Sequence, residues 1–197
     1  MTTPTLTGDR VRLEPLTLDH LAALEKVAFD ETIWRYMVTW VGTPQDLRQW
    51  VEDALAKSAT GSSFPWVTAL ADGTVIGASR FADYDAKHRT VEIGHTWLAA
   101  PYRGTGVNTE VKLLQLSYAF EDLNMRRVAL KTHHENARSR AAILALGAKE
   151  EGTFRNHLIM PDGSTRHTVW YSITNEDWPS IKKRLQQRIA NFAEPTK

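Results

Sequence analysis

The chain has 197 residues, a length typical of one domain, of which 42% are hydrophobic and 24% are charged. A net charge of +1 excludes a strong overall electrostatic field that would recruit nucleic acid or anionic lipid. The lack of cysteine excludes disulfides, thiolate metal sites and a cysteine nucleophile. No apolar run reaches membrane-spanning length, and the first residues lack a signal-peptide pattern. We therefore expect one cytoplasmic domain over residues 1–197, with no metal, no nucleic-acid partner and no membrane partner.

The first half of the chain alternates between strand-like and helix-like hydrophobic spacing. In chain order we expect a strand at 10–14, a helix capped by Thr17, a helix that starts at Thr43-Pro44, and a hairpin of strands 66–70 and 75–81.

The second half continues with strands separated by helices. We expect a strand at 90–98, a helix at 108–120, a strand at 127–132, a helix at 136–146 that Gly147 ends, a hairpin of strands 154–160 and 167–173, and a last helix capped by Asn175. This order predicts an α/β fold with one mixed sheet and helices on both faces.

The loop Arg103-Gly104-Thr105-Gly106 lies directly before the helix at 108–120. Glycines allow close backbone approach, and the first N–H groups of a helix attract phosphate groups. Alternatively, the two glycines only turn the chain. A P-loop is excluded because no lysine follows Gly106, and a dinucleotide fingerprint is excluded because its third glycine is missing.

A third phosphate loop matches better. Residues Arg103 to Asn108 resemble the [QR]-x-x-G-x-[GA] loop of the GNAT acyltransferase superfamily, with Asn108 departing from the last position. The resemblance to the ribosomal-protein N-acetyltransferase (RimJ/RimL) branch extends in order over residues 8–190. Its other parts are Arg10–Leu16, Val91–Leu98, Asn136-Ala137-Arg138-Ser139 with Ile143–Ala148, and Trp170–Ile173.

This resemblance implies a GNAT fold with a single, mixed, mostly antiparallel twisted sheet, acetyl-CoA as the donor, and a primary amine as the acceptor. The acceptor is a protein or peptide N-terminus, or a small amine. The resemblance places the donor pyrophosphate on Arg103, Gly104, Thr105, Gly106, Val107, Asn108 and Thr109, and the pantetheine arm on Trp97, Leu98, Ala99 and Asn136.

Two residues are candidates for proton transfer. Glu92 interrupts an apolar strand, so it is either the base that deprotonates the amine or the partner of an arginine such as Arg80 or Arg126. Strand alternation predicts that His95 lies on the opposite side of the strand; it titrates near neutrality and could serve as the base instead, or else it is a histidine satisfied in the core. The resemblance makes Ser139 the acid that protonates the departing thiolate; otherwise it is a solvated first-turn serine.

The segment around Trp34, Tyr36 and Trp40 borders the acceptor site by resemblance, or else packs between helices. We expect His133 and His134 at the surface, pointing apart, and not in a metal site. Because no cysteine is present, an acyl-cysteine intermediate is impossible, and direct attack of the amine on the thioester in a ternary complex is the simplest route. The rival hypotheses are a non-catalytic acyl-CoA sensor or interaction module and a nucleotide-binding module, and a homodimer is left open.

Overall fold

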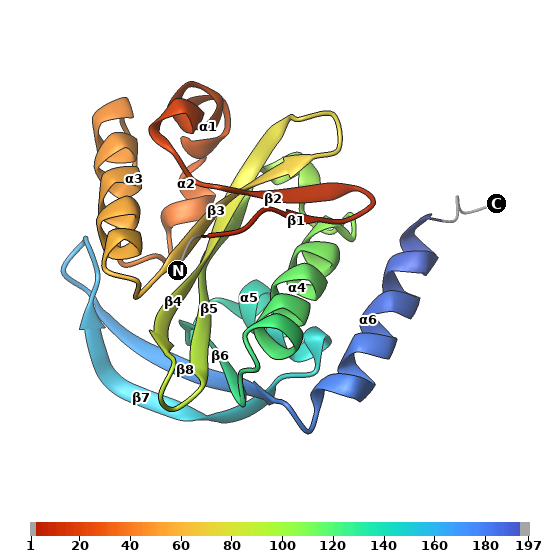
Figure 1. Cartoon of the computed structure of the whole chain (residues 1–197). Coiled ribbons are helices and arrows are strands. Elements are labelled where there is room, and N and C mark those ends of the chain that lie inside the picture. The colour runs from red at the N-terminus through yellow and green to blue at the C-terminus, as the bar shows by residue number, and fades with distance from the viewer. Residues whose placement is uncertain (1–2, 194–197) are drawn as a thin grey trace.

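The computed structural model describes residues 3–193, and within this range it contains eight strands and six α-helices (Figure 1). The strands are β1 (Leu6–Thr7), β2 (Val11–Pro15), β3 (Phe64–Leu70), β4 (Val75–Asp85), β5 (Thr90–Leu98), β6 (Arg127–His133), β7 (Lys149–Ile159) and β8 (Thr165–Thr174). The helices are α1 (Leu21–Ala28), α2 (Glu31–Trp34), α3 (Pro44–Ala59), α4 (Val107–Ser117), α5 (Ala137–Leu146) and α6 (Trp178–Ala193). None of the helices in this range is both long and apolar enough to cross a membrane.

The strands form one sheet in the order β1-β2-β3-β4-β5-β6-β8-β7. Every neighbouring pair is antiparallel except β5 and β6, which run parallel. The predicted fold class, a mixed and mostly antiparallel sheet with helices on both faces, is confirmed.

Two hydrophobic clusters cover the two faces of the sheet. One joins the sheet to α4, α5 and α6, and the other joins it to α1, α2 and α3. Figure 1 shows these two groups of helices on opposite sides of the strands. Trp34, Trp50 and Trp97 pack against one another in the second cluster, with ring centroids 5.7–6.2 Å apart.

Local capping signals decide where several helices begin. Thr43 accepts a hydrogen bond from the backbone N–H of Asp46, and Asn136 accepts one from that of Ser139, so α3 and α5 begin where the sequence predicts. The last helix begins later than expected: Asn175 is not its cap, because the first helical residue is Trp178 and the N–H of Ile181 donates to the carbonyl of Asp177. The short elements β1 and α2 carry no periodic pattern and were not predicted.

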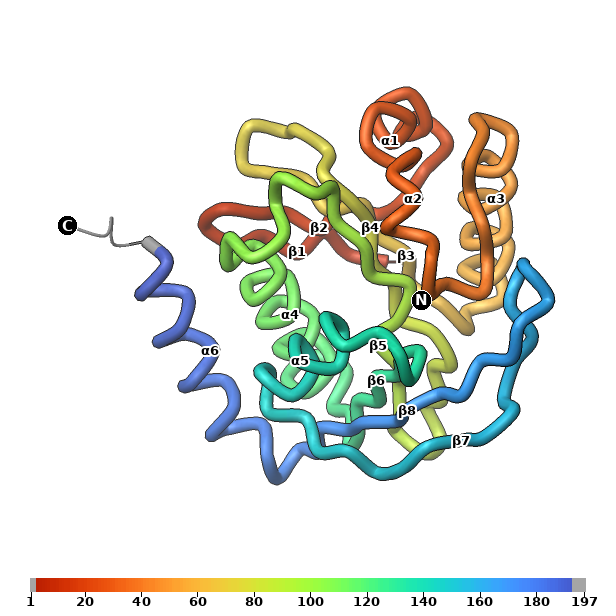
Figure 2. Tube along the Cα trace, turned by 180° about the vertical axis from the view of Figure 1, so that it is seen from behind, coloured from red at the N-terminus to blue at the C-terminus, as the bar shows by residue number. Residues whose placement is uncertain are grey.

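The parallel strands β5 and β6 diverge near the centre of the sheet. The two strands pair only from Thr90 to Glu92 on β5 and from Arg127 to Ala129 on β6. Beyond Glu92 they separate, and the chain then passes from β5 into α4 beside α5 (Figure 2). This separation positions the cleft described next.

Candidate active site

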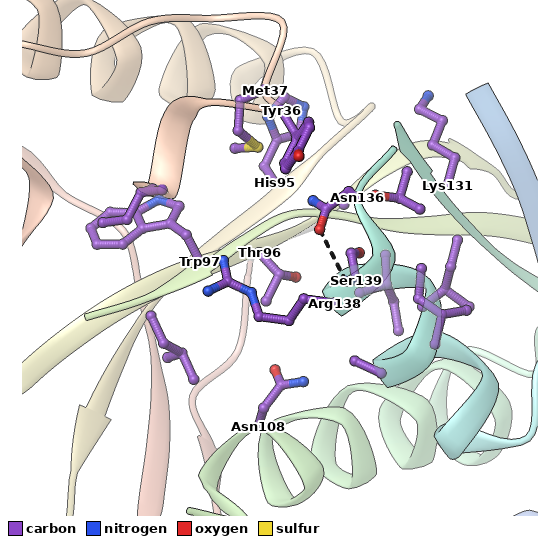
Figure 3. A pocket seen from close by; sticks show the side chains of 18 of the residues that line it. Tyr36, Met37, His95, Thr96, Trp97, Asn108, Lys131, Asn136, Arg138 and Ser139 are labelled. Carbon is purple, nitrogen blue, oxygen red and sulfur yellow. Dashed lines mark hydrogen bonds between the residues drawn. The ribbon is translucent and has the colours of Figure 1, made fainter. Parts of the chain in front are cut away.

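A cleft of about 370 Å³ lies where β5 and β6 separate. Its walls come from β5, β6, α4, α5, the start of β8 and the segment that follows α2. Figure 3 shows side chains from these elements directed toward one space. The cleft therefore joins segments from almost the whole length of the chain.

The loop before α4 presents a run of free backbone donors at the cleft. Gly106 takes a left-handed conformation (φ 85°) at the helix N-cap, and its carbonyl accepts from the N–H groups of Thr109 and Glu110. The five N–H groups of residues 104–108 have no acceptor among residues 3–193. Gly104 and Asn108 line the cleft, and the side-chain Oδ1 of Asn108 is buried without a partner. Such donors at a helix N-terminus fit the phosphate groups of CoA.

The two loop glycines have different surroundings. A Cβ at Gly104 (φ 77°) would meet no atom of residues 3–193 within 4 Å, whereas a Cβ at Gly106 would lie 2.6 Å from the ring of Phe192 on α6. Gly104 therefore borders open space, while Gly106 is needed for its backbone angle and for the packing of α6.

The side chain of Arg103 is directed away from this loop. Its Nε donates to the carbonyl of Leu98 (2.8 Å), and its guanidinium forms an ion pair with Asp30 (3.0 Å) and a hydrogen bond with Thr32 (2.8 Å). Its expected contact with a phosphate oxygen has no support in this geometry. Arg138, a motif residue to which the sequence assigned no role, extends into the cleft opposite Asn108 (Figure 3).

The residues expected to contact the pantetheine arm line the same cleft in part. Trp97 and Leu98 line it, whereas Ala99 is buried and its N–H donates to Ile76. On the opposite wall Asn136 caps α5 and Ser139 lies in the first turn (Figure 3). The hydroxyl of Ser139 has no hydrogen-bond partner among the described residues, which leaves it free for a ligand.

A bulge in β5 gives His95 a position that differs from the predicted one. Ala78 pairs with Trp97 but Arg80 pairs with Gly94, so β5 carries one extra residue here, and His95 has a φ of 50°. The bulge breaks the strand alternation, and His95 and Glu92 both line the cleft instead of lying on opposite sides. Burial, together with the positive charges of four nearby cations, lowers the pKa of His95 to about 3. The imidazole is therefore neutral and weakly basic at neutral pH.

Glu92 forms an ion pair, but with neither of the arginines that we expected. It is 3% exposed, and its Oε2 lies 2.6 Å from the Nζ of Lys131 on β6. Lys131 also lies over the ring of Trp170, 4.9 Å from its centroid. Burial raises the pKa of Glu92, and the charge of Lys131 opposes that rise. Glu92 is thus both a paired acid and a residue of the cleft wall.

A buried lysine lies under the bulge. Lys112 on α4 is 4% exposed and donates to Thr96 (2.7 Å), Gln115 (2.7 Å) and Ser79 (3.2 Å). No carboxylate in the described part of the chain lies within ion-pair distance, and burial lowers the pKa of Lys112 to about 7. Its helical position gave no signal in the sequence.

The expected acceptor aromatics do not all reach the cleft. Tyr36 lines it, with its ring 5.2 Å from that of His133. Trp34 is a core residue whose indole N–H donates to Ala28, and Trp40 is 45% exposed outside the cleft lining. The packing interpretation therefore holds for Trp34.

The adjacent histidines also differ from expectation. His133 is buried and not at the surface, and its ring stacks on that of His134 at 4.6 Å. They do not point apart because β6 ends at His133 and the chain turns there. Among the described residues no cluster could hold a metal ion.

Comparison with known proteins decides the family. The model of the acetyltransferase (GNAT) domain matches residues 10–149. The chain belongs to the GNAT acetyltransferase family. It is accordingly an acetyl-CoA-dependent N-acetyltransferase, since the GNAT family uses acetyl-CoA as its donor and the similar proteins are named N-acetyltransferases.

Individual relatives agree with this assignment. YdaF of Bacillus subtilis (strain 168), provisionally named a ribosomal N-acetyltransferase, is 34% identical over 113 residues, which span 57% of this chain and 61% of that protein. FsC-acetyl coenzyme A-N(2)-transacetylase of Aspergillus fumigatus is 27% identical over 96% of this chain and 84% of its own.

Solved structures show the same fold. The crystal structure of a GCN5-related N-acetyltransferase from Brucella melitensis superposes on this GNAT chain with a TM-score of 0.86, at 27% identity, over 96% of this chain and 86% of its own. RimJ of Mycobacterium smegmatis, solved with CoA-disulfide, gives a TM-score of 0.81 at 24% identity, over 95% and 97% of the two chains.

Proposed function

We propose that this cleft binds acetyl-CoA and transfers its acetyl group to a primary amine by direct attack in a ternary complex. The observation that carries the proposal is the run of five backbone N–H groups at residues 104–108 without acceptors, next to the separated strands β5 and β6. These donors suit the pyrophosphate, and the open edge of β5 near Trp97 suits the amides of the pantetheine arm.

Acetyl-CoA supplies the acetyl group as a thioester, and its transfer to the amine gives an amide and free CoA. The protein must hold the amine in its neutral form and supply a proton for the departing thiolate. Glu92 takes the proton that the amine releases, directly or through one water, because it is the buried carboxylate of the cleft wall. A raised pKa makes it a better base than an ordinary glutamate. His95 is too weakly basic for this role.

Ser139 supplies the proton to the thiolate. Its backbone N–H is held by Asn136, while its hydroxyl remains free and directed toward the cleft (Figure 3). Because the bond to Asn136 fixes the helix turn that carries this hydroxyl, the hydroxyl can donate without rearrangement of the turn.

The acceptor that we favour is the N-terminal amine of a protein. This choice is supported by the name of YdaF and by the fold shared with RimJ. Tyr36 and Met37 border the cleft on the side where the acceptor would enter.

The test is mass spectrometry of a mixture of proteome-derived peptides and small amines, incubated with the enzyme and isotope-labelled acetyl-CoA. Label at peptide N-termini supports the proposal. Label on small amines only would show that the acceptor is a small molecule and not a protein. Tight binding of acetyl-CoA with no label on any amine would favour a non-catalytic sensor.

A further inference from the structure

Like Lys112, Arg166 is a buried cation of the cleft without a counter-ion among the described residues. Arg166, at the start of β8, is 6% exposed and lines the cleft. No carboxylate among residues 3–193 lies within 4 Å of its guanidinium. Burying a charge without a partner is costly, so such a group is retained where it binds something of opposite charge.

Two of its three nitrogens are occupied by neutral groups. The Nε donates to Thr168 (3.0 Å), and Nη1 donates to the backbone carbonyl of Tyr36 (3.1 Å). The Nη2 has no partner among the described residues, and it is not one of the polar atoms sealed from solvent. The guanidinium is therefore fixed by two bonds and presents one free donor edge to the cleft.

The neighbouring charges leave this positive charge uncompensated. Lys131 is neutralised by Glu92 at 2.6 Å, with Asp83 at 3.8 Å. Glu92 and Arg166 interact electrostatically at a distance, but they are too far apart to form an ion pair. The cleft therefore contains both the carboxylate of Glu92 and the guanidinium of Arg166, and these two groups do not touch.

This pair is complementary to a zwitterion. We propose that the acceptor is an amine that also carries a carboxylate, with the amine directed toward Glu92 and the carboxylate bound by Arg166. The proposal rests on the proposed function, because it assigns the acceptor of the same cleft. Arginine suits this role because its fork of N–H donors matches a carboxylate. Two sources supply such chemistry: a free amino acid, and a peptide whose N-terminal residue is acidic.

The competing explanation is that Arg166 only ties β8 to the segment after α2. A purely structural arginine would support every acceptor equally, whereas a binding arginine would favour acceptors with a carboxylate. The experiment therefore compares matched acceptors in wild type, Arg166→Gln and Arg166→Lys. Arg155→Gln serves as the control, because it removes an exposed charge from the neighbouring strand β7, outside the cleft.

The first pair of acceptors is alanine and alaninamide, and the second is a tripeptide amide with aspartate or asparagine at its N-terminus. Wild type should prefer the acid member of at least one pair, and the pair that shows the preference identifies the source. The kcat/KM preference should fall roughly tenfold to a hundredfold in Arg166→Gln, the range expected for a lost hydrogen bond to a charged group, and remain in Arg155→Gln. Alaninamide carries the less protonated amine, so nucleophilicity alone would favour the amide.

Calorimetry with the CoA-saturated protein gives a readout that does not need turnover. Wild type should bind the acid more tightly than the amide, and the difference should vanish in Arg166→Gln. Equal use and equal binding of acids and amides by wild type would overturn this inference while leaving amine acetylation intact. An equal loss for both members in Arg166→Gln and Arg166→Lys would also overturn it and leave Arg166 as a structural residue. Absence of any amine acetylation would instead contradict the proposed function.

Discussion

The carboxylate of Glu92 on β5 lies 2.6 Å from the ammonium of Lys131 on β6, just where the two parallel strands begin to separate. Both residues line the cleft, with Glu92 buried and Lys131 about a quarter exposed. The charge of Lys131 opposes the rise that burial causes in the pKa of Glu92, and proton removal from an amine requires the carboxylate in its charged form.

Replacing the carboxylate tests that role. Glu92→Gln should lower kcat severalfold or more and leave the affinity for acetyl-CoA near that of wild type, because the amide keeps the shape but cannot take a proton. Steady-state rates and calorimetry measure the two quantities. Glu151→Gln breaks a similar inter-strand ion pair, with Arg127, outside the cleft and is the matched control. Normal turnover with a large loss of melting temperature in Glu92→Gln would leave Glu92 a purely structural acid.

The second prediction concerns His95. Because its pKa is lowered to about 3, its protonation cannot shape the activity profile near neutral pH. His95→Asn, which tolerates the left-handed backbone at this position, should therefore leave the position of the rising limb of kcat against pH unchanged. A shift of that limb by a full pH unit would show that the imidazole takes part in the proton transfer.

Ser139 should affect chemistry more than binding. Ser139→Ala is expected to lower kcat by roughly 10²–10⁴-fold, the usual contribution of a positioned proton donor, with little change in the Kd for acetyl-CoA. Ser180→Ala removes a serine from the first turn of α6, outside the cleft, and controls for helix stability. If Ser139→Ala turns over like wild type, water protonates the thiolate.

The fourth prediction concerns the loop at residues 103–108, where adding one methyl group tests whether CoA binds. Gly104→Ala adds a Cβ with no atom of the described residues within 4 Å, so a loss of affinity for CoA reports on the space that the ligand occupies. Gly73→Ala, in the β3–β4 turn, imposes the same left-handed strain (φ 89°) in equally open surroundings. Calorimetry should show weaker CoA binding for Gly104→Ala alone. Equal affinities for CoA in the two variants would show that this loop does not belong to the cofactor site.

Lys112 should make stability depend on alkaline pH. Its pKa is about 7 in the folded protein and 10.5 in the unfolded chain, so between these values the unfolded chain binds more protons and the free energy of unfolding rises with pH. Relative to Lys112→Met, wild type should gain up to about 1.4 kcal/mol per pH unit in this window. Denaturant titrations at pH 7 and pH 9 measure the difference. A constant offset between the two proteins would mean that Lys112 titrates normally.

The parts of the fold that short-range signals determine could be predicted. Strand β5 has the bounds that its apolar run predicts, and α3 and α5 begin at their capping residues Thr43 and Asn136. The cap of α6 was misplaced because Asn175 and Asp177 are both suitable capping residues, and only the packed structure distinguishes them.

The site was predictable only where it follows a local motif. Arg103, Gly104 and Asn108 of the loop line the same cleft as Ser139 of α5, and the family resemblance led us to expect these two segments near each other. The Glu92–Lys131 pair depends on the register between two parallel strands that are distant in sequence, and the bulge at His95 depends on how β4 pairs with β5. Lys112 and Arg166 acquire their burial from tertiary packing, which no spacing rule shows.

The most direct test of transfer by direct attack is the initial rate of CoA thiol release, measured while the concentrations of acetyl-CoA and of an amine acceptor are both varied. The account predicts release only when the amine is present, with reciprocal plots that intersect, because both substrates occupy the cleft before chemistry and no cysteine can hold the acetyl group. Parallel plots, or tight binding of acetyl-CoA without amine-dependent release, would contradict it.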